Sequence, residues 1–288
     1  MGSAYLAAII PKGVRLYKEL DVGRYHARPP SMYHTLTELP RSLIELSSLF
    51  AALPTLSNLP KGDRHPILLL PGFMAGDSST LMLRRFLLYM GYEPLPWTLG
   101  RNTGSLEQFE EKLINRFYQL ARTYNEKISI IGQSLGGVFA RNIAHRFPDH
   151  VRQVITLGSP FGAMAASSTN QLVTALFRQQ SGLSVEEMSS KISGIEAGKS
   201  PSVPSTAIFS KGDGVVNWRV CREDAGYQTE SIEVRGSHCG MGFNPLIYYI
   251  VSDRLSQPEK QWRQFDRKKL QKFTYPGSFV YTLQGIFS

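Results

Sequence analysis

The stretch Lys127-Ile128-Ser129-Ile130-Ile131-Gly132-Gln133-Ser134-Leu135-Gly136 decides how this chain is expected to fold. Its first half is an apolar run of strand length, and its second half has the pattern G-x-S-x-G. Residues 138–144 then continue with the composition of a helix. A strand, this pattern and a helix in succession predict a nucleophile elbow, a sharp turn that holds a serine above the edge of a sheet. Ser134 is therefore the predicted nucleophile.

The length and composition bound the class of protein. A chain of 288 residues can bury one large core, and we expect one α/β domain with an insertion rather than two domains. Two cysteines, Cys221 and Cys239, cannot form a disulfide framework or a four-cysteine zinc site, and we expect no metal. Every apolar run is shorter than the roughly 20 residues of a membrane-spanning helix, and the first residues lack the basic start of a signal peptide. We therefore expect a cytoplasmic protein.

The positive charge is concentrated towards the carboxyl end. The formal net charge is +9, and more than half of it comes from residues 254–272, which hold seven basic and two acidic residues. The basic residues are Arg254, Lys260, Arg263, Arg267, Lys268, Lys269 and Lys272. Together with the aromatic residues among them, they favour either a peripheral contact with an anionic membrane or a solvated face. No nucleic-acid-binding motif accompanies this charge, so nucleic acid is not an expected partner.

Residues 1–62 are expected to be a mostly helical extension of the main domain. After Pro40, apolar residues recur at the i, i+3, i+4, i+7 spacing of an amphipathic helix. They are Leu43, Leu46, Leu49, Phe50 and Leu53. The other face carries serine and alanine with Arg41 and Glu45, unlike the Lys- and Arg-rich face of an interfacial membrane helix. We therefore expect this helix to pack on the main domain through its apolar face, with Pro54 interrupting the chain after it.

From His65 onward, strand and helix signals alternate, which predicts a mostly parallel sheet with helices on both faces. The run Ile67-Leu68-Leu69-Leu70 is wholly apolar, as a strand covered on both sides should be. Further strands are expected at residues 92–99, 127–131, 151–157, 206–210 and 231–234. Helices are expected at residues 79–90, 106–124 and 138–144, and another begins at Pro245. We assign residues 63–288 to this α/β domain, with a basic tail from about residue 254.

Residues 162–203 interrupt the alternation and are expected to form a small helical cap. Two apolar stripes lie in this segment: Leu172, Val173, Leu176 and Phe177, and then Val185, Met188, Ile192 and Ile195. The pattern Ser184-x-x-Glu187 before the second stripe is typical of a capping box. An insertion here would lie over the carboxyl ends of the strands, where open α/β sheets bind ligands. We expect the cap to line a substrate pocket; the alternative is an ordinary crossover helix with an irregular connection.

A serine hydroxyl needs a base to become a strong nucleophile, and His238 is the predicted base. It follows an expected strand and lies in a glycine-rich loop, Gly236-Ser237-His238-Cys239-Gly240. Such a loop at the carboxyl end of a strand can deliver a side chain to the elbow. His145 and His150 lie on the elbow helix and the turn after it, where surface or packing roles are expected instead.

The acid that orients the histidine is expected on the loop after the preceding strand. Asp213 lies there between two glycines, in Gly212-Asp213-Gly214. Its task would be to fix the imidazole tautomer and to stabilise the imidazolium. Glu223 and Asp224 are nearby acids that lack this strand-end position, although the sequence leaves Asp224 open.

The negative charge of a tetrahedral intermediate needs backbone N–H donors, which form an oxyanion hole. The residue after the nucleophile, Leu135, is expected to supply one donor. The loop after the first core strand, Pro71-Gly72-Phe73-Met74, is expected to supply the other, from Phe73. Asp77 is expected to organise the turn that holds this loop.

Five motifs together, in this order, resemble those of bacterial α/β-hydrolases of the lipase/esterase type. They are Leu70-Pro71-Gly72-Phe73, Gly132-Gln133-Ser134-Leu135-Gly136-Gly137, Ser159-Pro160-Phe161-Gly162, Gly212-Asp213-Gly214-Val215-Val216 and Ser237-His238-Cys239-Gly240-Met241-Gly242. The resemblance covers roughly residues 63–255. It implies an α/β-hydrolase fold and hydrolysis of carboxylic esters through an acyl-enzyme, without a cofactor. Many lipases have histidine where this chain has Pro71 and Gln133, which alters the loop and the surroundings of the serine but not the triad.

The leading hypothesis is a serine esterase or lipase-like hydrolase, whose substrate is a small-molecule acyl ester with an apolar acyl portion. The apolar composition of the cap motivates this preference. A thioesterase or an acyltransferase on the same scaffold is the nearest alternative, because the acyl-enzyme can form from a thioester or be resolved by another acceptor. A non-catalytic, membrane-associated scaffold that keeps the fold is a third hypothesis. It would account for the basic tail but not for three well-placed triad residues.

Overall fold

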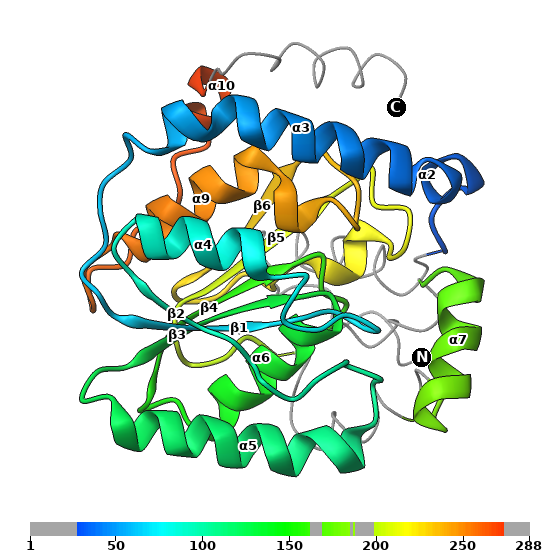
Figure 1. The fold of residues 1–288 in the computed structure, drawn as a ribbon, viewed down its shortest axis with the longest axis horizontal. Coiled ribbons are helices and arrows are strands. Elements are labelled where there is room, and N and C mark those ends of the chain that lie inside the picture. The colour runs from blue at the N-terminus through cyan, green and yellow to red at the C-terminus, as the bar shows by residue number, and fades with distance from the viewer. Residues whose placement is uncertain (1–27, 162–168, 185–186, 188–198, 274–288) are drawn as a thin grey trace, which may run out of the picture.

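The computed structural model describes residues 28–161, 169–184, 187 and 199–273 of the chain. Their centre is a six-stranded sheet with the order β2-β1-β3-β4-β5-β6 (Figure 1), in which every neighbouring pair is parallel. The strands are β1 (Pro66–Leu70), β2 (Glu93–Leu95), β3 (Ile128–Gln133), β4 (Val151–Leu157), β5 (Ser205–Ser210) and β6 (Thr229–Val234). The predicted fold class, a mostly parallel sheet between helices, is confirmed.

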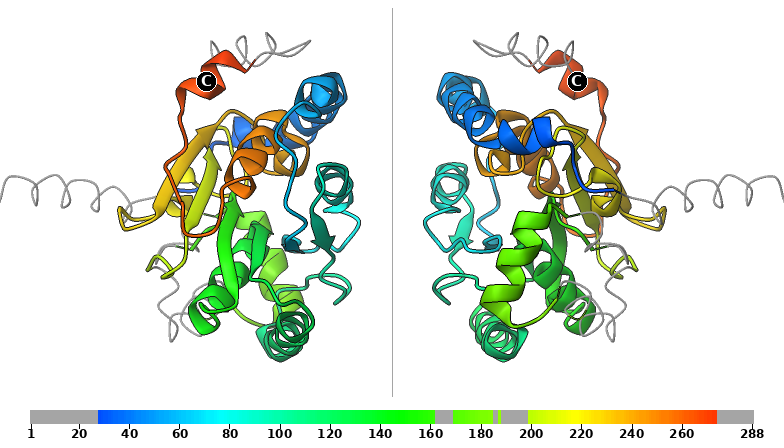
Figure 2. Two further views of the ribbon diagram at one scale, coloured as in Figure 1. Left: turned by 90° about the vertical axis from the view of Figure 1, so that its left-hand side faces the viewer. Right: turned by 90° about the vertical axis from the view of Figure 1, so that its right-hand side faces the viewer.

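Helices cover both faces of this sheet. They are α2 (Met32–Leu36), α3 (Glu38–Leu56), α4 (Leu81–Tyr89), α5 (Leu106–Thr123), α6 (Leu135–Arg146), α7 (Gln171–Ser181), α9 (Pro245–Leu255) and α10 (Lys268–Lys272), with short 3-10 turns η1 (Trp218–Cys221) and η2 (Met241–Phe243). Helices α3, α4 and α9 lie on one face, and α5 and α6 lie on the other, as the side views also show (Figure 2). Burial by these two layers explains why all five residues of β1 are apolar or proline and inaccessible.

Two clusters of apolar side chains form the core, one on each side of the sheet. The first contains Leu49 of α3, Leu87 of α4 and Ile250 of α9, each completely buried. The second contains Phe117 of α5 and Ala140 of α6. Because neighbouring side chains of a strand point to opposite faces, the apolar residues of β1 and β3 are divided between the two clusters.

Strand β2 is much shorter than residues 92–99, which the sequence predicts as a strand. Only Glu93–Leu95 pair with β1. Pro94 and Pro96 have no N–H to donate to a ladder, which limits pairing to the edge of the sheet. Beyond them, Thr98 has a positive φ of 61°, and the N–H groups of Trp97 and Thr98 bond to the Asp77 carboxylate instead.

Helix α3 packs through only part of the face that its leucines predict. Leu43 and Phe50 are 65% and 56% exposed, whereas Glu38 and Glu45 are buried. The side of α3 nearest the strand ends meets backbone N–H groups of two loops, which carboxylates can satisfy and leucine side chains cannot. Further along, the buried Leu49 belongs to the same core cluster as α9, so α3 does pack on the main domain.

The two prolines of α3 lie within the helix, Pro40 in its first turn and Pro54 in its last. Helix α3 begins at Glu38, before Pro40, and continues to Leu56, beyond Pro54. Proline is tolerated in the first turn because N–H groups there have no intrahelical acceptor. Near the other end, Ser57 Oγ donates a hydrogen bond to the carbonyl of Pro54 at 2.8 Å, which helps to close the last turn.

The cap segment is described in part. Helix α7 is capped by the Asn170 side chain at its start and by Gly182, with a φ of 70°, at its end. The predicted capping box is present: Ser184 N–H donates to Glu187 Oε2 at 2.6 Å, and Glu187 N–H donates to Ser184 Oγ at 3.0 Å. The second stripe of the predicted cap, residues 185–195, falls outside the described residues except for Glu187.

Part of the basic carboxyl-terminal charge is paired inside the fold. Arg254 is 3% exposed and forms an ion pair with Glu230 at 2.6 Å. Lys269 forms an ion pair with Asp253 at 2.7 Å. Among the described residues, no helix is both long and apolar enough to cross a bilayer.

Candidate active site

Ser134 lies on a strained turn between β3 and α6. Its φ of 50° and ψ of −122° are unusual for a residue with a side chain, and such strain is concentrated at functional sites. A Cβ atom at Gly132 would overlap the backbone of Gly136, and one at Gly136 would overlap the carbonyl of Leu70. The Ser134 N–H donates to the Leu157 carbonyl at 2.8 Å, which ties the turn to β4. The glycines therefore allow the turn to be tight enough to raise the serine at the strand end.

His238 and Asp213 are brought together from the loops after β6 and β5. His238 Nδ1 donates a hydrogen bond to Asp213 Oδ2 at 2.6 Å, since an ionised carboxylate can only accept. The other carboxylate oxygen, Oδ1, accepts the N–H groups of Val215 at 2.9 Å and Val216 at 2.7 Å. The Asp213 side chain is 3% exposed, so the turn and the histidine together fix its orientation.

The two alternative acids lie elsewhere. Glu223 is buried in an ion pair with Arg141, and it also accepts a hydrogen bond from Ser200 Oγ at 2.8 Å. Asp224 is exposed. The structure therefore places Asp213, and neither of these acids, against Nδ1 of His238.

The environment of His238 acts on its pKa in two opposite directions. Burial disfavours the imidazolium and would lower the pKa. The negative charge of Asp213, its hydrogen bond and the more distant charge of Glu38 outweigh burial, so the pKa is raised above its ordinary value. A histidine with a raised pKa is a stronger base, which suits proton abstraction from a hydroxyl.

The elbow and the histidine loop are joined by Gln133, the residue before the serine. Its Nε2 donates a hydrogen bond to the carbonyl of His238 at 3.2 Å. Ser134, Asp213 and His238 follow the carboxyl ends of β3, β5 and β6, which are parallel strands of one sheet and therefore end at the same edge. Gln133, where many lipases have histidine, serves here as a link between two of the three loops.

The loop predicted to form the oxyanion hole lies directly against the serine. A Cβ atom at Gly72 would be 3.3 Å from the Cβ of Ser134, so the backbone of the loop approaches the nucleophile closely. The next N–H after Phe73, that of Met74, already donates to the carbonyl of Asn102 at 2.7 Å. Phe73 follows Gly72 on this loop, and Leu135 is the first residue of α6, where N–H groups lack intrahelical acceptors.

Comparison with known proteins supports the architecture. Residues 99–188 match the family model described as the alpha/beta hydrolase fold. Among solved structures, the chain is similar to a monoacylglycerol lipase from Paleococcus ferrophilus, with a TM-score of 0.53, 13% identity, and coverage of 69% of this chain and 96% of the other. The chain has an α/β-hydrolase fold. None of the curated proteins matches its sequence significantly.

Two further structures with this fold differ in their stated activities. Lipase B from Aspergillus fumigatus has a TM-score of 0.54 at 16% identity, over 71% of this chain and 56% of its own. The 2,6-dihydroxy-pseudo-oxynicotine hydrolase has a TM-score of 0.52 at 17% identity, over 70% of this chain and 63% of its own. At such identities the likeness shows the α/β-hydrolase fold alone.

In this α/β-hydrolase fold, α7 covers the loop beside the nucleophile. The Phe177 ring is buried and lies 5.2 Å from the ring of Phe73, centroid to centroid. Gly104 has a φ of 77°, and a Cβ atom there would overlap the Phe177 ring. Two other members of the predicted apolar stripe are not buried as Phe177 is: Leu172 is 77% exposed and Leu176 is 40% exposed. A single aromatic side chain therefore anchors α7 over the predicted oxyanion loop.

Three residues of α3 belong to the site but were not predicted as site residues. Glu38, Arg41 and Glu45 all contact the loops that carry Asp213 and His238. Their spacing of three and four residues places them on one face of the helix. The signal in the sequence is that Glu38, Arg41 and Glu45 recur at helical spacing on an otherwise apolar helix.

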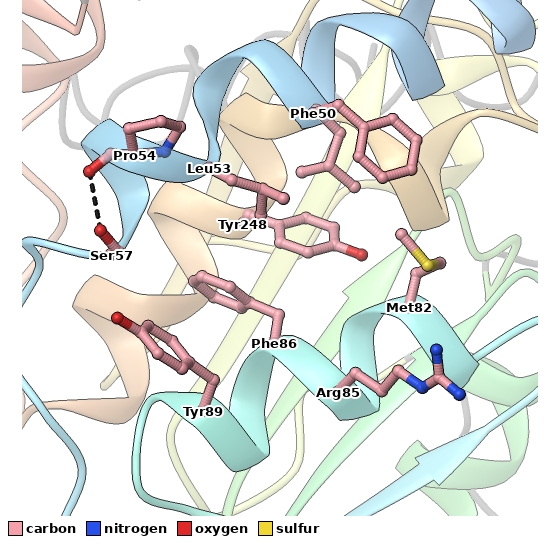
Figure 3. A pocket seen from close by; sticks show the side chains of 10 residues that line it. Phe50, Leu53, Pro54, Ser57, Met82, Arg85, Phe86, Tyr89 and Tyr248 are labelled. Carbon is pink, nitrogen blue, oxygen red and sulfur yellow. Dashed lines mark hydrogen bonds between the residues drawn. The ribbon is translucent and has the colours of Figure 1, made fainter.

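An apolar groove lies between α3 and α4, with Tyr248 of α9 between them (Figure 3). Its volume is about 690 Å³. It is lined by Leu49, Phe50, Leu53, Pro54, Ser57, Met82, Arg85, Phe86, Tyr89 and Tyr248. No predicted triad or oxyanion residue lines it, so this groove is separate from the candidate active site.

Proposed function

We propose that this protein is a serine hydrolase that cleaves carboxylic esters with an apolar acyl portion, through an acyl-enzyme on Ser134. One observation supports this most strongly: the strained serine turn lies at the same sheet edge as the His238–Asp213 hydrogen bond of 2.6 Å. A structural role needs neither a serine in this conformation nor a buried histidine–carboxylate pair beside it. The α/β-hydrolase fold and the likeness to lipases and other hydrolases agree with a hydrolase.

In the proposed reaction, Ser134 Oγ attacks the carbonyl carbon of the ester and its proton passes to Nε2 of His238. Asp213 holds Nδ1–H and stabilises the imidazolium. The N–H groups of Leu135 and Phe73 bind the oxyanion, and each such donor contributes about 3 kcal/mol of transition-state stabilisation. The imidazolium then gives its proton to the departing alkoxide. Water, deprotonated by His238, attacks the acyl-enzyme, the bond between Ser134 Oγ and the acyl carbon breaks, and the imidazolium returns the proton to Oγ as the acid leaves.

The preference for an apolar acyl group rests on the side chains beside the predicted oxyanion loop. The rings of Phe73 and Phe177 are in contact there, and Phe177 is buried against this loop. Apolar side chains next to an oxyanion hole favour an acyl chain, which gains from leaving water.

The experiment that tests this proposal is labelling with a fluorescent fluorophosphonate, alongside hydrolysis of p-nitrophenyl esters of increasing chain length. We expect labelling of the wild type and none of Ser134→Ala. We also expect Ser134→Ala to lower kcat by about 10⁶-fold, the loss seen when the nucleophile of a serine protease is removed. Matched thioesters, and added alcohol as an acceptor, separate ester hydrolysis from thioester hydrolysis and acyl transfer.

Unreactive wild-type protein that is folded would contradict the proposal and favour a non-catalytic scaffold. A Ser134→Ala variant that keeps near wild-type turnover would also contradict it. Faster turnover of thioesters than of matched esters would retain Ser134 as the nucleophile but replace the ester substrate.

A further inference from the structure

The carboxylate of Glu38, on α3, binds the backbone of both loops that carry the predicted base and acid. Glu38 Oε1 accepts the N–H of Gly214 at 2.8 Å and the N–H of His238 at 3.0 Å. Glu38 Oε2 accepts the N–H of Cys239 at 2.8 Å. Gly214 directly follows Asp213, so one side chain holds the acid loop and the base loop in a single set of hydrogen bonds.

Arg41, one turn further along α3, holds the acid loop by a carbonyl, whereas Glu38 holds it by an N–H group. Its Nη2 donates to Glu38 Oε1 at 3.1 Å, and its Nη1 donates to the carbonyl of Gly212 at 2.6 Å. The residues on either side of Asp213 are therefore both held by α3, one through its N–H and the other through its carbonyl. Arg41 also donates to the carbonyl of His34 at 2.9 Å, which fixes the junction between α2 and α3.

Burial makes these contacts strong. Glu38 is 6% exposed, and hydrogen bonds to a charged acceptor away from water are worth more than those between neutral groups. The acid loop also lies directly against α2, because a Cβ atom at Gly214 would overlap the carbonyl of His34. A neutral amide at this position could not accept all three N–H groups, since its nitrogen only donates.

The negative charge of Glu38 also reaches the base. The charged groups that act on the pKa of His238 are Asp213 and, more weakly, Glu38, and both favour the imidazolium against the effect of burial. Arg41 lies on the far side of Glu38 and pairs with it. Glu45, from the same helix, contacts the neighbouring N–H of Ser237 at 2.6 Å. Removing the charge of Glu38 alone should therefore lower the pKa of His238.

We propose that Glu38 is a positioning residue for the catalytic triad, which sets the distance and orientation between Asp213 and His238 by binding both of their loops. This inference rests on the proposed function, because the pair it positions is the proposed acid and base. It adds a second carboxylate, supplied by helix α3, to the machinery of the site.

Three variants of α3 separate positioning from general support of the fold. Glu38→Gln keeps the size of the side chain and removes the charge. Glu38→Asp keeps the charge and shortens the side chain. Leu43→Gln is the matched control, because Leu43 lies on the same helix and is 65% exposed. Each is measured for kcat and KM on a p-nitrophenyl ester across pH, for the pKa of the His238 ring by NMR, and for amide hydrogen exchange.

We expect Glu38→Gln to lower kcat by about ten- to a hundredfold, with little change in KM. Loss of hydrogen bonds to a charged group can account for a decrease in kcat of this size. The acidic limb of its kcat profile and the pKa of His238 should move to lower pH. The amides of Gly214, His238 and Cys239 should exchange faster. Glu38→Asp should lose rate while keeping the acidic limb at the wild-type pH, and Leu43→Gln should match the wild type in every measurement.

A Glu38→Gln variant that is merely less stable, with the wild-type pH profile and wild-type exchange at these three amides, would overturn the inference. If Glu38→Gln does not fold, a Glu38→Asp variant with wild-type kcat and exchange would overturn it equally. Failure of the proposed function looks different: wild-type protein would then not react with fluorophosphonate. The His238 pKa and the amide exchange would still report whether Glu38 holds the two loops.

Discussion

His238 Nδ1 lies 2.6 Å from Asp213 Oδ2, although the two residues belong to loops that follow different strands. Strands β5 and β6 pair in parallel, from Ser205 with Thr229 to Ser210 with Val234, so both loops leave the sheet at the same edge. Both side chains are nearly inaccessible to water. The contact is therefore a buried pair between a carboxylate and an imidazole, at the same edge of the sheet as Ser134.

Replacing Asp213 by Asn should lower kcat on the order of 10⁴-fold, as the corresponding change does in a serine protease, because the imidazole loses its partner for the correct tautomer. The pKa of His238 should fall as well, since burial would then act without its main opposing charge. The neutral base persists to lower pH, so the acidic limb of the residual activity should shift downward. A kcat–pH series for wild type and variant measures both effects. Asp224→Asn is the control and should match the wild type.

Glu45 should make the stability of the protein depend on pH. Burial raises its pKa to about 7, against the hydrogen bond from Ser237 and the charge of Arg41, while the charge of Glu38 adds to the rise. The folded state thus holds a proton that the unfolded state has released, so stability is greatest at low pH and falls as pH rises through this pKa. Relative to Glu45→Gln, the wild type should lose up to about 3 kcal/mol of unfolding free energy between about pH 4 and pH 8.

Urea unfolding of both proteins at several pH values checks this prediction. The unfolding free energies of the wild type and Glu45→Gln should differ little at acidic pH. Towards alkaline pH the variant should become the more stable of the two. A difference that does not change with pH would show that Glu45 keeps its ordinary pKa. Ser47→Ala, an exposed change on the same helix, should follow the wild type throughout.

Phe177→Ala should weaken the site through the loop that carries Phe73. The variant removes a buried ring from a contact of 5.2 Å with Phe73, and such truncations cost about 3 kcal/mol in well-packed places. We expect a lower kcat on all esters and a weaker preference for long acyl chains. Leu172→Ala on the same helix is the control, because Leu172 is 77% exposed. Equal chain-length profiles for the three proteins would exclude Phe177 from the acyl site.

The basic tail stays a predicted contact for anionic membranes. Replacing Lys268, Lys269 and Lys272 by Gln should weaken binding to phosphatidylserine vesicles, measured by co-sedimentation. The loss of binding free energy should be about 3 kcal/mol at most, since each basic residue near the surface contributes about 1 kcal/mol. Lys269 should contribute least, since it already pairs with Asp253 at 2.7 Å. Lys112→Gln on α5, across the sheet, is the control (Figure 1). Unchanged sedimentation of the triple variant would leave the tail as a solvated face.

Local patterns in the sequence predicted most of the fold. Apolar runs such as Ile67–Leu70 indicate buried strands because a parallel sheet is covered on both faces. The elbow around Ser134 could be predicted because strand, glycine-flanked serine and helix are consecutive in the chain, so their geometry is local. The positions of Asp213 and His238 followed from the rule that parallel strands end at one edge, and the capping box at Ser184 followed from its own four residues.

Only the tertiary structure decided which groups meet. The sequence left Asp224 open as the acid, and the contact of Asp213 with His238 resolves that choice geometrically. It predicted that α3 would pack through its leucines, and Leu49 does so, but Glu38 and Glu45 are buried as well, because the neighbouring loops present N–H groups that need acceptors. Amphipathic spacing is a property of one helix alone. The identity of its partner, here the backbone of two loops about 200 residues further along the chain, is fixed only when the whole sheet has formed.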